Sequence, residues 1–327
     1  MEKVYDAHCH HNFDMPIETA IEIFKEEFEM TGTEKVIFLA LPHHVEDGKL
    51  SFDQEQNKNA LHLKKAFFPN GYAFAGLVHP IDGEYTEKIA DDFEMQVKEY
   101  ISQGFDGIKM LEGYPNLRKV MGIKLCDKVY DKFYAYCEEN AIPITMHFAN
   151  PAANWDITKA SKYDIEHGRC YDDTYPTKDE LTEEVFAILR KYPQLRLTLA
   201  HFGFMSDDIS VAERFMSYQN TIFDLTPGGE QLLNMAKKWD KWSPFFEKYQ
   251  DRIVYGTDMY AFPRDFEGGW EQAVYRRPNL IRELFETDTL HEYIGEKFQG
   301  IKLATKIRDK IYRENFTRLY GTPKRVK

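Results

Sequence analysis

The sequence lacks the features of membrane, secreted and disulfide-stabilised proteins. None of its apolar stretches approaches the roughly eighteen residues of a membrane span, and its first residues do not pair a basic segment with an apolar one, as a signal peptide does. The four cysteines, Cys9, Cys126, Cys137 and Cys170, include no C-x-x-C pair and are too few for a disulfide framework. We therefore predict a soluble, cytoplasmic protein with free thiols.

Positive charge is also scarce. The chain has 42 basic and 54 acidic residues, and its formal net charge of -12 would repel nucleic acid and anionic membrane surfaces. Apolar residues make up 43% and charged residues 29%, which excludes a disordered or fibrous chain and is enough for a large core. We therefore expect a small-molecule partner and no nucleic-acid or membrane partner, and we leave the oligomeric state open, with a homodimer as one option.

The sequence contains no internal repeat, low-complexity tract or Pro/Gly-rich linker, so we expect residues 1–327 to form a single domain. Eight short apolar runs bounded by turn residues predict strands. These runs are residues 3–8, 35–41, 72–78, 107–111, 143–148, 195–201, 220–225 and 252–258.

Longer segments between these runs show the periodicity of helices. Residues 84–104 and 127–140 carry apolar side chains at four-residue spacing, and Gly104 offers a helix stop. Strands separated by helices pair in parallel, and continuous apolar runs are typical of strands buried on both faces. Eight such units predict an α/β fold, a closed (β/α)8 TIM barrel.

Two connections are longer than a barrel needs. Residues 149–180 follow the fifth predicted strand and are rich in Asn, Asp, Pro and Tyr, and residues 261–278 follow the eighth. Loops of this length in compact domains are usually binding loops or lids. In a barrel both would lie at the C-terminal ends of the strands, where active sites are found.

Chemically capable residues gather at the ends of five predicted strands. They are His8 and His10 in the first, Lys109 in the fourth, His147 in the fifth, His201 in the sixth and Asp258 in the eighth. Because side chains alternate along a strand, His8 and His10 should face the barrel interior together, with Cys9 on the other side. Imidazole and carboxylate groups suit zinc, manganese and iron, so this joint placement predicts a metal site.

The remaining polar residues of these segments have simpler interpretations. A histidine at the end of an apolar strand is usually a hydrogen-bonded core residue, which is our interpretation of His43, His44 and His79. Asp6 has the same parity as His8 and His10, and we expect it to orient a ligand histidine through its second ring nitrogen. We place His11 outside the ligand set.

The motifs DAHCHHNF, GFDGIKML, IPITMHFANP, LRLTLAHFG, IVYGTDMY and IYRENFTRLYG occur in this order over nearly the whole chain. They resemble the signatures of the amidohydrolase superfamily, and above all of its amidohydrolase-related (amidohydrolase 2) branch, which includes aminocarboxymuconate semialdehyde decarboxylase-like enzymes. The resemblance implies a metal-dependent barrel enzyme with His8, His10, His147 and Asp258 as metal ligands. It also implies that His201 lies beside the metal and polarises water or substrate.

Lys109 bears on the number of metal ions. In two-metal relatives the lysine of the fourth strand is carboxylated and bridges the ions, and residues matching His147 and His201 hold the second one. Carboxylation requires a depressed lysine pKa. We favour one divalent ion, Zn2+ ahead of Mn2+ or Fe2+, with Lys109 and His201 as alternatives for a second metal or for substrate.

These residues indicate metal-dependent hydrolysis of a C-O or C-N bond in a small, carboxylated substrate. A metal ion would lower the pKa of bound water to about 7, Asp258 would move its proton, and His201 would stabilise charge on the attacked oxygen. The alternative is a decarboxylase or hydratase of an unsaturated acid that uses the same site. A barrel that only binds a ligand is disfavoured, because Asp258 and His201 are both present.

Three basic residues and one aromatic residue are candidates for substrate binding. Lys109, Arg169 and Arg264 offer cations that pair with a carboxylate, and a guanidinium does so through two hydrogen bonds. Trp155, in the long loop after the fifth strand, would suit a flat substrate. The simpler interpretation is that the arginines are surface cations and that Trp155 packs within its loop.

Overall fold

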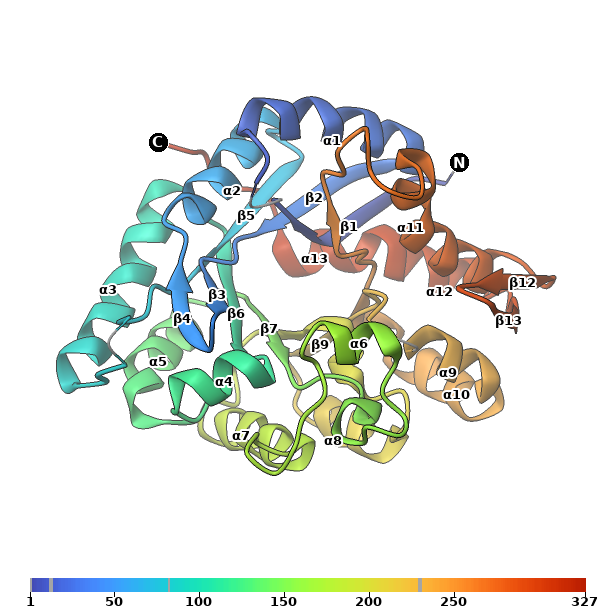
Figure 1. Ribbon diagram of the computed structural model, residues 1–327. Coiled ribbons are helices and arrows are strands. Elements are labelled where there is room, and N and C mark those ends of the chain that lie inside the picture. The colour runs from blue at the N-terminus through green and yellow to red at the C-terminus, as the bar shows by residue number, and fades with distance from the viewer. Residues whose placement is uncertain (1, 12–13, 82, 229–230) are drawn as a thin grey trace.

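The computed structural model describes residues 2–11, 14–81, 83–228 and 231–327. Its main feature is a nine-stranded parallel sheet with the order β10-β9-β8-β7-β6-β5-β2-β1-β11, which curls on itself and is surrounded by helices (Figure 1). The strands are β1 Val4–His10, β2 Thr33–Leu39, β5 Gly71–Gly76, β6 Gly107–Gly113, β7 Ile144–Phe148, β8 Leu197–Leu199, β9 Thr221–Asp224, β10 Ile253–Val254 and β11 Met259–Tyr260.

The sheet closes through β10 and β11, which are two halves of one extended segment. Ile253 of β10 pairs with Phe223 of β9, whereas Met259 of β11 pairs with Cys9 of β1. Between the two halves, the amide of Ala7 donates to the Tyr255 carbonyl at 3.0 Å. The segment therefore completes the ring as its eighth staves, and the predicted (β/α)8 barrel is confirmed, with each predicted strand found near its predicted position.

The helices lie outside this ring (Figure 1). They are α1 Ile17–Thr31, α2 Glu55–Ala66, α3 Glu87–Gln103, α4 Pro115–Met121, α5 Asp131–Glu139, α6 Lys162–Glu166, α7 Lys178–Lys191, α8 Ile209–Met216, α9 Gln231–Lys237, α10 Trp239–Tyr249, α11 Trp270–Glu286, α12 Thr305–Asp309 and α13 Asn315–Tyr320. Helix α3 ends at Gly104, whose φ of 108° is the left-handed conformation that glycine tolerates. Among the described residues, no helix is both long and apolar enough to cross a membrane.

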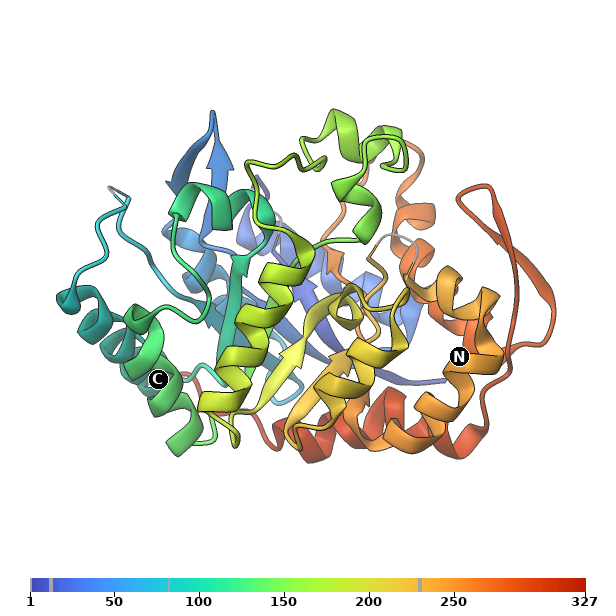
Figure 2. The same cartoon turned by 90° about the horizontal axis from the view of Figure 1, so that it is seen from below.

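The two ends of the barrel differ. On the side of the strand C-termini, the hairpin of β3 (His43–Glu46) and β4 (Lys49–Phe52) and the short helix α6 project beyond the ring, whereas the C-terminal helices run along the opposite edge (Figure 2). There, the Phe316 ring of α13 packs edge-on against Tyr72 and Tyr5, at centroid distances of 5.1 and 5.7 Å. The interior at this end is apolar and filled, so polar chemistry is confined to the other end.

Three sequence predictions need correction. A second hairpin, β12 (Leu290–Tyr293) with β13 (Glu296–Gln299), was not predicted, nor was the β3–β4 hairpin. The long loop predicted over 261–278 is wrong in its second half, because α11 begins at Trp270 and continues through Pro278. The buried side chains on one face of α11 stabilise the helix despite the hydrogen bond that proline cannot make.

The sixth strand is also shorter than predicted. Strand β8 ends at Leu199, and Ala200–Phe204 form a tight turn in which His201 and Phe202 have φ values of 55° and 53°. The loop over 149–180 contains a 3-10 turn at Ala152–Trp155 and helix α6, and it ends in a capping box at Thr177, where α7 begins.

A buried ion pair ties α2 to the barrel. The Lys64 ammonium lies 2.6 Å from Asp106 Oδ2 and donates to the Gly104 carbonyl at 2.6 Å, and the same Asp106 oxygen accepts the amide of Ala73 on β5. The Lys64 side chain is fully buried. Removal of the cation alone would leave a buried carboxylate without its counter-charge.

We predict that Lys64→Met lowers the free energy of unfolding by about 3 kcal/mol, because breaking a buried pair leaves one charge uncompensated. Lys58→Met is the matched control, since Lys58 is exposed and pairs with Glu55 at 2.8 Å on the helix surface, where such pairs contribute little. Urea denaturation followed by circular dichroism measures both. Equal stability of the two variants would contradict the structural role of the Lys64–Asp106 pair.

Candidate metal centre

His8 and His10 converge at the C-terminal end of β1. Their Nε2 atoms lie 3.0 Å apart, and both side chains are buried, while Cys9 between them packs in the hydrophobic core. The shared inward face predicted from strand alternation is therefore confirmed for these two rings. Asp258 Oδ1 completes the group, at 3.3 Å from His10 Nε2 and 3.7 Å from His8 Nε2. The three residues form a group whose ligand atoms all lie within 4.8 Å of one another.

The hydrogen bonds on the far side of the two rings assign their protons. His10 Nδ1 lies 2.7 Å from the Leu39 carbonyl, which can only accept, so Nδ1 carries the proton and Nε2 has a free lone pair. His8 Nδ1 lies 2.8 Å from Asp224 Oδ2, which assigns the same tautomer. Burial lowers the pKa of His10, and that of His8 to well below its ordinary value, so both rings are neutral. Two lone pairs and a carboxylate oxygen thus face one another with no proton between them, and this donor set fits a divalent cation.

Asp258 is held in a defined orientation. Its φ of 57° is left-handed, and its amide donates to the His8 carbonyl at 2.7 Å. Arg277 Nη1 lies 2.8 Å from Asp258 Oδ2 and also donates to the Asp258 carbonyl. Burial raises the pKa of this carboxyl, but the charge of Arg277 and the hydrogen bond to His10 outweigh it and hold the pKa well below its ordinary value. Oδ2 is therefore taken by Arg277, and Oδ1 is left to face the histidines.

His201 lies directly beside this group. Its ring centroid is 5.1 Å from that of His8 and 4.8 Å from that of His147. Burial lowers the pKa of His201 to about 3, so the ring is neutral, and its buried Nδ1 has no hydrogen-bond partner among the described residues. Gly228 lies against this nitrogen, where an added Cβ would come within 2.8 Å. The left-handed backbone and the unpaired polar atom are features that cluster at functional sites.

Asp224, at the end of β9, connects the two parts of the site. Its Oδ2 accepts from His8 Nδ1, and its Oδ1 accepts the amide of His201 at 2.7 Å and that of Thr226 at 3.2 Å. A carboxylate behind a ligand histidine fixes the tautomer and orientation of the ring. The sequence alone did not single out Asp224, although its position at the end of the seventh predicted strand was a usable signal.

The role predicted for Asp6 is wrong. Its carboxylate accepts the amides of His8 at 2.9 Å and Thr257 at 3.1 Å and the Thr257 hydroxyl at 2.5 Å, and it contacts no imidazole nitrogen. Asp6 does lie inside the barrel, but one layer below the rings, where the neighbouring segment presents Thr257. It therefore positions backbone, while Asp224 orients His8.

His147 and Lys109 lie at the edge of the group. His147 Nε2 is 3.3 Å from Asn150 Oδ1 and its ring stands edge-on to Tyr114, so it lies beside His201 but outside the three-residue group. Lys109 Nζ is 3.5 Å from His8 Nε2. Burial lowers the pKa of Lys109 to about 8, although neighbouring carboxylates act in the opposite direction.

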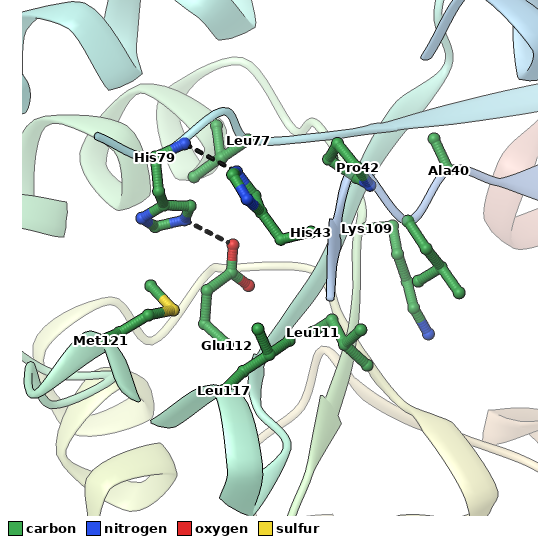
Figure 3. A pocket seen from close by; sticks show the side chains of 12 residues that line it. Ala40, Pro42, His43, Leu77, His79, Lys109, Leu111, Glu112, Leu117 and Met121 are labelled. Carbon is green, nitrogen blue, oxygen red and sulfur yellow. Dashed lines mark hydrogen bonds and ion pairs between the residues drawn. The ribbon is translucent and has the colours of Figure 1, made fainter. Parts of the chain in front are cut away.

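Lys109 also lines a narrow cavity between β6 and the β3–β4 side of the barrel (Figure 3). The cavity volume is about 10 Å³, which is room for about one water molecule. At its other end, the His79 amide donates to His43 Nε2 at 2.8 Å, and His79 Nε2 lies 2.8 Å from Glu112 Oε1 (Figure 3). The interpretation of His43 and His79 as hydrogen-bonded core histidines is confirmed.

The predicted substrate residues divide by location. Arg264 is exposed, pairs with Glu26 and lies over the Trp270 ring at 3.9 Å, so the structure does not bring it to the metal group. Trp155 donates from Nε1 to the Pro176 carbonyl at 3.0 Å and packs on Tyr171 within the long loop.

Arg169 is closer to the histidines. Although burial opposes it, the charges of Tyr114 and Tyr163 and a hydrogen bond to Tyr114 raise the pKa of its guanidinium, and it lies over the Tyr163 ring at 5.5 Å. Because Tyr114 packs against His147, this places Arg169 at the mouth of the barrel.

We predict that Asp224→Asn weakens zinc binding about 10- to 100-fold, the usual effect of removing a carboxylate behind a ligand histidine. Competition with a chromophoric chelator measures the affinity. Asp240→Asn, at an exposed position on α10, is the matched control and should bind zinc like the wild type. Zinc binding of undiminished strength in a folded Asp224→Asn protein would contradict the role of Asp224.

Comparisons with known proteins give the family. A family model described as amidohydrolase matches residues 6–322. A TIM-barrel protein from Bordetella bronchiseptica is 16% identical with a TM-score of 0.60, over 97% of this chain and 98% of its own. A probable 2-pyrone-4,6-dicarboxylic acid hydrolase from Acinetobacter baumannii, with citric acid bound, is 13% identical with a TM-score of 0.56, over 98% and 100%.

A third structure, the 2,6-dihydroxybenzoate decarboxylase from Rhizobium, is 16% identical with a TM-score of 0.51, over 98% of this chain and 99% of its own. At these identities the structures support the fold alone. No curated protein sequence matches the chain significantly. The match to the family model over residues 6–322 shows that the chain belongs to the amidohydrolase family, as its motifs predicted, and is an enzyme of that family.

Proposed function

We propose that this protein is a metal-dependent hydrolase that cleaves a C-O or C-N bond in a small carboxylated substrate. The observation that carries the proposal is the convergence of His8 Nε2, His10 Nε2 and Asp258 Oδ1, three unprotonated donors with no hydrogen between them. Nitrogen and oxygen donors of this kind suit Zn2+ first and Mn2+ or Fe2+ next. A divalent cation held there would supply Lewis acidity, which polarises a substrate oxygen and makes water a nucleophile near neutral pH.

Asp258 is the proposed proton carrier. The Arg277 contact keeps its carboxylate ionised and fixes Oδ2, so Oδ1 is the atom that takes a proton from water and returns it to the leaving group. Arg277 thereby acts as a positioning residue, and it lies on the half of 261–278 that proved helical.

His201 is the proposed partner of the attacked oxygen. Its low pKa keeps the ring neutral at physiological pH, so it acts by hydrogen bonding from an N–H and not by releasing a proton from an imidazolium. Its unpaired Nδ1 gives it an unused polar atom at the site. His147, whose ring adjoins that of His201, is the proposed fourth ligand.

The carboxylated nature of the substrate rests on the cations around the group. Lys109 lies at the group itself, and Arg169 lies at the mouth, where either offers a partner for a carboxylate. The names of two structurally similar enzymes refer to carboxylic acids, a 2-pyrone dicarboxylic acid and 2,6-dihydroxybenzoate. The net charge of -12 further supports a small-molecule partner in place of nucleic acid.

Decarboxylation is the second candidate, because the barrel resembles that of a decarboxylase as well as that of a hydrolase. The same cation site would bind a substrate carboxylate, and Asp258 or His201 would move the proton. The two functions differ in their product, since only decarboxylation releases carbon dioxide.

For the metal site, we predict about one zinc ion per chain, the stoichiometry of a single catalytic zinc centre, in protein purified with zinc and washed with chelator. The double variant His8→Ala, His10→Ala should lose the metal because it removes two of the three converging donors. His167→Ala, at an exposed position in the long loop, should retain it. Elemental analysis gives the stoichiometry, and equal metal content in the wild type and the double variant would contradict the site.

For the reaction, we predict that a panel of lactones, amides and unsaturated acids contains a substrate that is hydrolysed without release of carbon dioxide. Asp258→Asn should lower kcat about 10³-fold, since it removes the proton carrier, whereas Asp240→Asn should not change kcat. Product analysis and carbon dioxide detection are the measurements. Stoichiometric carbon dioxide would establish the decarboxylase in place of the hydrolase.

A further inference from the structure

A basic groove lies at the end of the barrel opposite the metal centre. Its volume is about 550 Å³, and its lining includes Arg196, Lys248, Arg252, Arg318 and Tyr249. Arg196 directly precedes β8 and Arg252 directly precedes β10, so the groove adjoins the N-terminal ends of these strands. The histidines and Asp258 follow the C-terminal ends, and the groove is therefore separate from the proposed active site.

The three arginines of this groove are positioned by neutral oxygen atoms. Arg252 donates from Nη1 to the Tyr218 carbonyl at 2.8 Å and from Nη2 to the Met216 carbonyl at 2.7 Å. Arg196 Nη1 donates to the Ala141 carbonyl at 3.0 Å. Arg318 Nη2 donates to the Asp251 carbonyl and, at 3.3 Å, to Asn315 Oδ1. These bonds fix the guanidinium groups but leave their charge uncompensated.

Other arginines of the chain are neutralised by carboxylates, as Arg118 is by Glu184 and Arg282 by Glu286. In the described part of the chain, no carboxylate forms an ion pair with Arg196, Arg252 or Arg318.

The two carboxylates nearest the groove do not change this balance. Asp251, the acidic residue in the lining, is paired with Lys310 at 2.8 Å, and Glu213 approaches Lys248 only at 3.8 Å. Burial lowers the pKa of Arg196, and the nearby charge of Arg318 lowers it further, as expected when two like charges lie close together. A local excess of positive charge therefore persists in a protein with a net charge of -12.

We propose that this groove is a binding site for a small multivalent oxyanion, an organic phosphate or a polycarboxylate. An anion would relieve the repulsion among the cations, and the fixed guanidinium groups have further N–H donors to offer it. Tyr249 lies between Lys248 and Arg252, whose charged groups are 4.7 and 5.2 Å from its ring centroid, and its ring would pack against the organic part of the ligand. This site does not depend on the proposed function of the metal centre.

Isothermal titration of the full chain with pyrophosphate, inorganic phosphate and citrate, at constant ionic strength, tests the proposal. We expect saturable binding of one anion per chain. Lys248→Gln and Arg252→Gln should each weaken it about tenfold, the typical effect of losing a charged hydrogen-bond donor. Lys98→Gln, which removes an equally exposed lysine on α3, should bind like the wild type. Tighter binding of pyrophosphate would identify the ligand as a phosphate, and tighter binding of citrate as a polycarboxylate.

Two further variants keep the outcome decisive. The His8→Ala, His10→Ala protein should bind the anion normally, which separates this site from anion binding at the metal centre. Lys248 donates to no backbone carbonyl, so Lys248→Gln tests the charge even if Arg252→Gln fails to fold. The proposal is overturned if none of the three anions binds saturably, if Lys248→Gln binds as tightly as the wild type, or if the double histidine variant loses the binding.

Discussion

The hydrogen bond between Asp224 and His8 is the interaction on which the candidate metal centre depends. It joins residues 216 positions apart in the sequence and assigns the proton of His8 to Nδ1, which leaves Nε2 free to face His10 and Asp258. The second oxygen of Asp224 holds the amide of His201. One buried carboxylate thus sets both the donor atom of a proposed ligand and the position of the residue proposed to contact the substrate oxygen.

Closure of the barrel and assembly of the site occur in the same segment. Between β10 and β11 the chain leaves regular pairing, and Asp258 adopts its left-handed conformation there, bonded to the His8 carbonyl. Gly256 in this segment permits the close approach, because a Cβ would come within 3.2 Å of His8 Cβ and 2.6 Å of Thr226 Oγ1. The residue that completes the metal group is therefore available only when the ring is closed.

The barrel separates two kinds of chemistry by its two ends. Buried neutral imidazoles and an ionised carboxylate converge at the C-terminal ends of the strands, where a cation is the missing charge. At the other end Phe316 fills the interior, and arginines fixed by carbonyls border a surface groove where an anion is the missing charge. Because each set of groups is fixed by its surroundings before any ligand binds, little reorganisation is needed at either end.

The sequence by itself determined the barrel and much of the donor set. Apolar runs alternating with amphipathic segments predict parallel strands, and alternation along one strand is enough to put His8 and His10 on the same side. What it could not decide depends on contacts between distant segments. Asp6 has the right parity but faces Thr257, whereas Asp224 reaches His8 from β9, and Arg277 reaches Asp258 from a helix. Periodicity describes the neighbours of a residue along one element, and only the tertiary structure decides which side chains of separate elements meet.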